Sequence, residues 1–161
     1  MNQLLLGIIL SVLPVIELRG GLPVALDYAI KSNFPVWLAF LTVMIANIFV
    51  IFLILIFLDF LHESFLKFKI YRRTFNFFLE RARKKAEKIE KNMKVYGYLA
   101  LTLFVAVPLP ITGAWTGTLI AWVLGLDRKK SIMSISLGVL IAGIIVLLAY
   151  FGILNLIRLS S

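Results

Sequence analysis

The sequence predicts an all-α integral membrane protein with two inverted repeats, each a re-entrant helical hairpin followed by a transmembrane helix, joined by basic amphipathic helices. Apolar residues make up 61% of its 161 residues, against about 45–50% in soluble proteins. Residues 32–58, 95–126 and 131–157 contain no charged side chain, and each stretch exceeds the roughly 20 residues that cross a bilayer core. The same order of parts also occurs twice along the single membrane domain, 1–161.

The first repeat covers residues 1–58 and begins with an apolar stretch that is broken once. The break is the segment Glu17-Leu18-Arg19-Gly20-Gly21-Leu22-Pro23, between the largely apolar stretches 4–16 and 24–30. Glycine and proline weaken a helix, so we expect the chain to leave the helical path here. An unbroken apolar span at 34–58 follows, and it is long enough to cross the bilayer.

The second repeat covers residues 98–161 and has the same parts in the same order. Its break is Pro108-Leu109-Pro110-Ile111-Thr112-Gly113, between apolar residues 98–107 and 114–126, and its long span is 132–156. Each interrupted stretch is either one kinked crossing helix or a re-entrant hairpin that turns back at mid-depth. A straight helix over 98–126 would reach about 44 Å at 1.5 Å per residue. This exceeds the roughly 30 Å core and favours the hairpin.

Residues 59–97 form a basic linker that we expect on the cytoplasmic face of the cell membrane. Eleven Lys and Arg side chains fall within 67–94, and these residue types accumulate in cytoplasmic loops. With two hairpins, 14 basic residues lie inside and only Lys31 and Arg158 lie outside, so both termini are predicted outside. The halves then have inverted topology, and transporters with such repeats place broken helices and their binding site at the midplane.

The linker also shows helical periodicity, because apolar side chains recur in steps of three and four residues from Leu61 to Tyr96. We expect its helices to lie in the interface, with basic side chains among anionic lipid headgroups. Spacing near 3.5 residues also permits a coiled coil between subunits. Headgroups, rather than nucleic acid, are the expected partner of the net charge of +9. Four short membrane elements surround a cavity poorly, so we expect a homodimer.

Glu17 and Arg19 are the only charged residues that the two-hairpin arrangement places deep in the bilayer. A charge there costs about 2.5–3.5 kcal/mol, so an intramembrane ion is a functional candidate. In extended chain these two positions share a side, and Gly20, Gly21 and Pro23 let the backbone leave the helix. We expect Glu17 to carry a proton, and Arg19 with freed backbone N–H groups to hold a phosphate or other anion. The alternative is a structural ion pair that locks the hairpin tip.

The second break carries no charge, and we expect it to be the partner surface of the first. Pro108, Pro110 and Gly113 interrupt the helix, and the Thr112 hydroxyl can satisfy a freed carbonyl. Thr112 and Thr116 lie four residues apart, so on a helix they share a face that is available to a polar ligand. The alternative is that both hydroxyls bond back to their own backbone.

The remaining polar residues give no indication of an enzyme. His62 is the only histidine, and with Asp59 and Glu63 it makes too small a set for a metal site, so a headgroup contact is expected. The chain has no cysteine and no Gly-rich phosphate loop with a lysine. We therefore expect no catalytic residue, no metal and no cofactor. Asn47, alone in the middle of its span, is expected to make a hydrogen bond between helices.

The segments 17–23 and 108–117 resemble the paired motifs of the small multidrug export protein family, distant members of the DedA (VTT domain) superfamily. The resemblance covers nearly the whole chain. It implies two opposed re-entrant helices and, from better-known superfamily members, translocation of lipids such as polyprenyl phosphates with proton coupling. In those relatives an acidic residue in the first hairpin and arginines in the second motif are functional. Glu17 matches the first role, whereas 108–117 has no arginine and the only deep arginine is Arg19.

Together these patterns predict a transporter, with proton-coupled translocation of an anionic lipid, such as a polyprenyl phosphate or phospholipid, between leaflets as the preferred function. Two alternatives stay open: efflux of small hydrophobic drugs, although Arg19 would repel a cationic one, and a non-transporting membrane scaffold whose basic helices recruit anionic lipid. The predicted substrate and proton site comprises Glu17, Arg19, Gly20, Gly21, Pro23, Pro108, Pro110, Thr112, Gly113 and Thr116.

Overall fold

The computed structural model describes residues 3–65, 91–109 and 112–160, and this part of the chain is helical without strands. The predicted all-α class is therefore confirmed. Most of the predicted amphipathic linker at 59–97 lies outside the described residues, and its two ends belong to the helices on either side. The helices are α1 (Gln3–Val12), α2 (Glu17–Lys31), α3 (Val36–Phe65), α5 (Lys91–Ala106), α6 (Ala114–Val123) and α7 (Arg128–Ser160).

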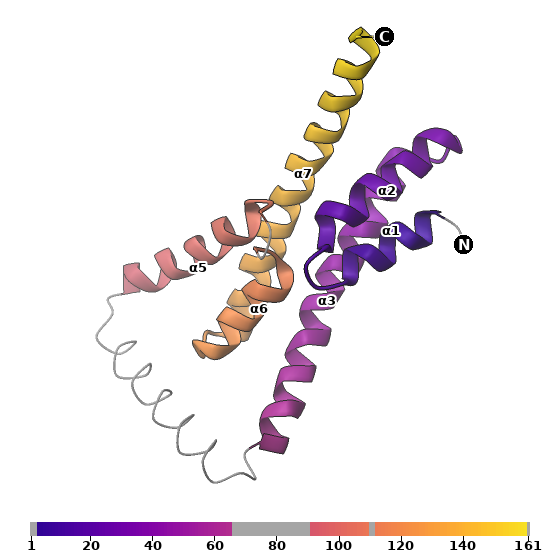
Figure 1. Ribbon diagram of the computed structural model, residues 1–161. Coiled ribbons are helices and arrows are strands. Elements are labelled where there is room, and N and C mark those ends of the chain that lie inside the picture. Colours follow the sequence, from indigo (N-terminus) through magenta and orange to yellow (C-terminus); the bar gives the residue numbers. More distant parts are fainter. Residues whose placement is uncertain (1–2, 66–90, 110–111, 161) are drawn as a thin grey trace.

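The first pair of helices, α1 and α2, forms a tight antiparallel hairpin (Figure 1). The chain reverses between Val12 and Glu17, several residues before the break that the sequence predicts, so the prediction of a non-helical segment over 17–23 is wrong. Pro14 explains the shift, because a proline disfavours helical backbone at the residue before it. The backbone of Val15 is left-handed, with φ 81°.

Helix α2 continues through Gly20, Gly21 and Pro23 because its packing outweighs their low helix propensity. Leu22 and Leu26, on either side of the proline, are completely buried. Gly21 serves a close helix crossing instead of a break. A Cβ at Gly7 would lie 2.8 Å from the carbonyl oxygen of Gly21, and a Cβ at Gly21 would lie 2.6 Å from the Cβ of Ser11.

The second interrupted stretch breaks where the sequence predicts. Helix α5 ends at Ala106, α6 begins at Ala114, and the two meet as the arms of a wide V (Figure 1). The predicted role of threonine in satisfying freed backbone groups is confirmed at Thr112. Its hydroxyl lies 2.6 Å from the carbonyl oxygen of Val107 and accepts a 3.2 Å hydrogen bond from the N–H of Leu109.

The long helices α3 and α7 run in opposite directions and contact each other near their middles (Figure 1). Gly143 permits this approach, since a Cβ there would lie 2.7 Å from the sulfur of Met44. Both helices are long and apolar enough to cross a membrane, over Val36–Leu61 and Arg128–Leu159. Only 39% and 22% of their most apolar stretches are buried within the chain, so large apolar faces point outward, as lipid-facing helices require.

The two broken elements fill opposite halves of the space beside these long helices. In Figure 1 the α1–α2 hairpin lies beside the half of α3 that begins at Val36, and α6 lies near the other half. The turn of the first hairpin and the break between α5 and α6 come together near the middle. The core that joins them includes Leu22, Leu26, Met44, Ile51 and Ile135.

The crossing of α1 and α2 predicts that Gly21→Ala destabilises the protein. The added methyl group meets backbone and Ser11, so we expect the free energy of unfolding to fall by about 1–3 kcal/mol. Gly152→Ala is the matched control: nothing lies within 4 Å of its Cβ position, and alanine gains up to about 1 kcal/mol of helix propensity. Denaturant titration in detergent compares them, and equal stability of the two variants would contradict the close crossing.

Candidate functional site

Three hydrogen bonds join the first hairpin, at its turn and at the start of α2, to the second break and the start of α6. The backbone N–H of Trp115 donates to Glu17 Oε1 at 3.1 Å, and the Trp115 indole N–H donates to the carbonyl oxygen of Val12 at 2.9 Å. Arg19 Nη2 donates to Thr112 Oγ1 at 3.0 Å. Residues far apart in the sequence therefore form one site, and each break supplies both donors and acceptors.

The Glu17 carboxylate lies at the N-terminus of α6, where it accepts a hydrogen bond from the helix backbone as an N-cap side chain would. The first N–H groups of a helix have no partner within it, and a negative charge there is stabilised by the helix dipole. Gly113, the residue before α6, offers no side chain for this purpose. A Cβ at position 113 would overlap the carboxylate. Glu17 is 6% exposed, so a buried acid is stabilised by another element's backbone.

Arg19 makes a single hydrogen bond among the described residues, the one to Thr112. A guanidinium has five N–H donors, so most of its donors remain available. The expected alternative, a Glu17–Arg19 ion pair that locks the tip, is not seen: the ion pairs between described residues are Lys31–Asp27 and Arg128–Asp59. Glu17 and Arg19 instead each contact the second break.

The two charged side chains face one cavity, but not through extended backbone as the sequence suggested. Glu17 has a left-handed φ of 45° at the first residue of α2, so the regular helical rotation does not set its direction. Arg19, two residues later, follows the helix. The shared orientation therefore comes from the turn that precedes α2, and the predicted role of Gly20 and Gly21 in it is wrong.

The cavity lies near the middle of both long helices, since Asn47 is central in α3 and Ala142 is central in α7. The expected bond between helices is confirmed at Asn47, whose Nδ2 donates to the carbonyl oxygen of Ser11 at 2.7 Å. Both polar and apolar residues line the cavity. Its lining residues are Glu17, Leu18, Arg19, Asn47, Val105, Thr112, Gly113, Ala114, Val139 and Ala142.

Several predicted site residues lie away from this cavity. Gly21 packs on α1, Pro23 lies inside α2, and Thr116 is not among the lining residues. Thr112 precedes α6, so the helical face that it was expected to share with Thr116 does not form. Pro110 lies outside the described residues. Pro108 belongs to the break itself, and Gly20 packs against Ile16.

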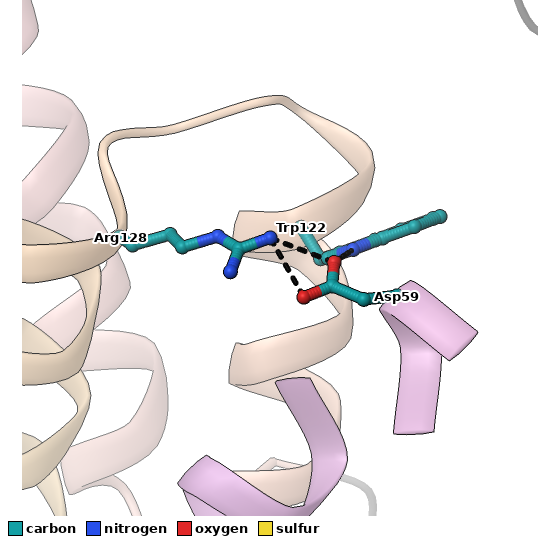
Figure 2. Close-up of polar contacts among 3 residues, drawn as sticks. All are labelled: Asp59, Trp122 and Arg128. Atoms are coloured by element: carbon teal, nitrogen blue, oxygen red, sulfur yellow. Dashed lines mark hydrogen bonds and ion pairs between the residues drawn. The ribbon is translucent and has the colours of Figure 1, made fainter. Parts of the chain in front are cut away.

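A second polar cluster, missed from the sequence, joins α3 to α6 and α7 (Figure 2). Arg128 Nη2 lies 2.7 Å from each oxygen of Asp59, and the Trp122 indole N–H donates to Asp59 Oδ1 at 3.0 Å. In the sequence Asp59 stands near His62 and Glu63, whose side chains lie outside the description, and nothing next to it points to Arg128. One feature of the sequence does indicate this pair: residues 59 and 128 each follow a long apolar span, and both spans end on the same predicted face of the membrane.

The described residues offer no group of three or more His, Cys, Asp or Glu that could hold a metal ion. Among the residues that line the cavity, the charged ones are Glu17 and Arg19. Their carboxylate and guanidinium can exchange a proton and bind an anion, respectively.

The packing of Gly113 against Glu17 predicts that Gly113→Ala costs about 1–3 kcal/mol of stability, because the methyl group displaces the carboxylate from α6. In a Glu17→Ala background the same change should cost clearly less, and a double-mutant cycle measures this coupling. Gly97→Ala, with open space around its Cβ position, is the control. An equal cost of Gly113→Ala in both backgrounds would refute the contact.

The Asp59–Arg128 pair predicts a small and salt-sensitive contribution to stability. Arg128 is 65% exposed, and pairs of this kind contribute about 0.2–1 kcal/mol. Asp59→Asn should therefore lower the free energy of unfolding by about that amount at low salt, and by less at high salt. Asp27→Asn, which removes an exposed pair within α2, is the control. A loss that does not change with salt would rule out an exposed ion pair.

Comparison with known families matches the model described as "Putative small multi-drug export protein" over residues 17–145. The match begins at Glu17, the first residue of α2, and includes α2, α3, α5 and α6, the break between α5 and α6, and part of α7. Comparisons with curated proteins and with solved structures give no match. The relation to the DedA superfamily stays a prediction. Because the matched region covers most of the chain, the protein belongs to the small multidrug export family, a family of membrane transporters.

Proposed function

We propose that this transporter moves an anionic lipid, such as a polyprenyl phosphate or a phospholipid, between the leaflets of the cell membrane, coupled to protons. The observation that carries the proposal is Arg19, a guanidinium with one hydrogen bond that lines a cavity near the middle of both long helices. A cation at such depth is expensive and usually marks a substrate or ion pathway. Its planar fork matches the geometry of phosphate oxygens.

The proposed coupling follows from the place of Glu17 on α6. An anionic headgroup would be attracted to the same N–H groups and to Arg19. The Glu17 carboxyl group occupies that position, so in its ionised form it competes with the headgroup. A proton on Glu17 removes the competing charge. Proton and headgroup should therefore bind together and move in the same direction, and the proposal includes no catalytic step.

The arrangement of the helices supports an inverted, re-entrant topology as part of this proposal. The ends of α1 and α2 away from their turn lie on the same side of the molecule as the beginning of α3 and the C-terminal half of α7 (Figure 1). Near the end of α6, by contrast, Trp122 bonds to Asp59. Each broken element thus enters from one face and stops near the middle. We propose that 59–97 is cytoplasmic, with its basic residues among anionic headgroups, that both termini are outside, and that the protein acts as a homodimer.

Efflux of small hydrophobic drugs is the second candidate, and the family description favours it. The apolar lining residues of the cavity, Leu18, Val105, Val139 and Ala142, could contact such a molecule. Arg19 would repel a cationic drug, so neutral or anionic compounds are the expected cargo in this case. Unchanged drug resistance of cells that express the protein would remove this candidate.

The test of the proposed function is uptake of a fluorescent polyprenyl phosphate, or of a fluorescent anionic phospholipid, by proteoliposomes under an imposed proton gradient. Glu17→Gln and Arg19→Ala should lower uptake to background, because the first cannot carry the proton and the second cannot hold the anion. Arg19→Lys keeps the charge but loses the planar set of paired N–H donors. Its uptake of lipid should fall about tenfold, which corresponds to about 1.4 kcal/mol.

Asp27→Asn and Lys31→Ala are the matched controls, since both alter an exposed charged pair on the same helix. They should transport at the rate of the unmodified protein. Full retained uptake of both fluorescent lipids in Glu17→Gln and Arg19→Ala would overturn the proposal.

A further inference from the structure

Asn47 is the most deeply buried polar side chain of the cavity, 1% exposed near the centre of α3. Its Nδ2 donates to the carbonyl oxygen of Ser11. This bond fixes which end of the amide is nitrogen, because the reverse orientation would place two oxygens together. The amide oxygen Oδ1 is therefore the part of Asn47 left to interact elsewhere.

No described residue donates a hydrogen bond to Asn47 Oδ1. The atom is also not sealed in the packing: the one fully enclosed side-chain polar atom without a partner in the described part of the chain is the hydroxyl of Ser131. Asn47 and Arg19 line the same cavity, so a ligand held by the Arg19 donors would lie beside the amide whose oxygen has no donor. Leaving such a buried acceptor unpaired is unfavourable, so a donor group on a ligand in the cavity would be stabilised.

We infer that Asn47 is a specificity-determining residue whose Oδ1 accepts a hydrogen bond from a donor group on the anionic headgroup. This inference rests on the proposed function and narrows its substrate class. Arg19 supplies donors for the negatively charged oxygens. Asn47 requires that the same headgroup also carry an O–H or N–H, so an anion without a donor fits less well.

Two kinds of lipid meet this requirement. A phosphate monoester carries the donor on the phosphate itself, as P–OH, and a diester can carry it on the attached head alcohol. An anionic diester with a simple alkyl head has the charge but no donor. Sites built to bond a hydroxyl discriminate strongly against analogues that lack it, since the buried group is then left unpaired.

The test uses three short-chain anionic lipids with the same acyl groups, titrated into the purified full chain in detergent by calorimetry: phosphatidic acid, phosphatidylglycerol and phosphatidylmethanol. The unmodified protein should bind phosphatidic acid or phosphatidylglycerol about tenfold more tightly than phosphatidylmethanol. Tighter binding of phosphatidic acid would place the donor on the phosphate, and tighter binding of phosphatidylglycerol would place it on the head alcohol. In Asn47→Ala this preference should disappear, while binding of phosphatidylmethanol persists.

Thr118→Ala is the matched control, because Thr118 is buried nearby, bonds only to the carbonyl oxygen of Ala114 and does not line the cavity. It should keep the preference. If Asn47 only joins α3 to α1, its loss lowers all affinities together and leaves their ratio unchanged, which overturns the inference. Equal binding of all three lipids to the unmodified protein also overturns it. Failure to bind any of them removes phospholipids from the proposed function, and this inference with them.

Discussion

The contact between the Glu17 carboxylate and the first N–H groups of α6 is the interaction on which the structure of the site depends. It joins residues 98 positions apart in the sequence, and it compensates a buried charge with an unpaired helix terminus. Each partner would be costly alone in a low-dielectric interior. Together they bring the two breaks into contact, and Gly113 provides the space that the contact needs.

This contact also determines where the remaining polar groups lie. Because the first hairpin turns just before Glu17, Arg19 reaches Thr112 and Asn47 reaches the backbone of Ser11. The result is a small cavity near the centre of two long apolar helices, lined by both polar and apolar residues. Its donors come from Arg19 and its acceptors from Glu17 and Asn47, which suits a ligand that is anionic and also donates a hydrogen bond. The family of exporters to which the chain belongs is consistent with a transport pathway at this place.

The sequence predicted the elements that depend on composition and local pattern. The charge-free spans became α3 and α7, and the second break fell at Pro108, because two prolines and a glycine leave the backbone few alternatives. The first break was misplaced, because Gly20 and Gly21 served close packing, while Pro14 ended α1. Whether Gly20 and Gly21 interrupt a helix or lie within it depends on what α2 packs against. Local helix propensity does not indicate this packing.

Contacts between residues far apart in the sequence could not be predicted from local sequence patterns either. Glu17 and Arg19 were correctly expected to face one cavity, but the bond from Trp115 to Glu17 and the Asp59–Arg128 pair require knowledge of which helices are neighbours. Asn47 was expected to join two helices, and it does. Its free oxygen became evident only from the structure. The sequence does not tell whether the nitrogen and the oxygen of a buried amide both have hydrogen-bond partners.

The central claim is that the α1–α2 hairpin enters and leaves the membrane on one face and meets the second break inside. The chain has no cysteine, so single cysteines can be introduced and labelled in sealed vesicles with a membrane-impermeant maleimide. Cysteines at Gln3 and Ser32 should be labelled from one side, and cysteines at Gly97 and Gly125 from the other. Labelling of positions 3 and 32 from opposite sides would contradict the account.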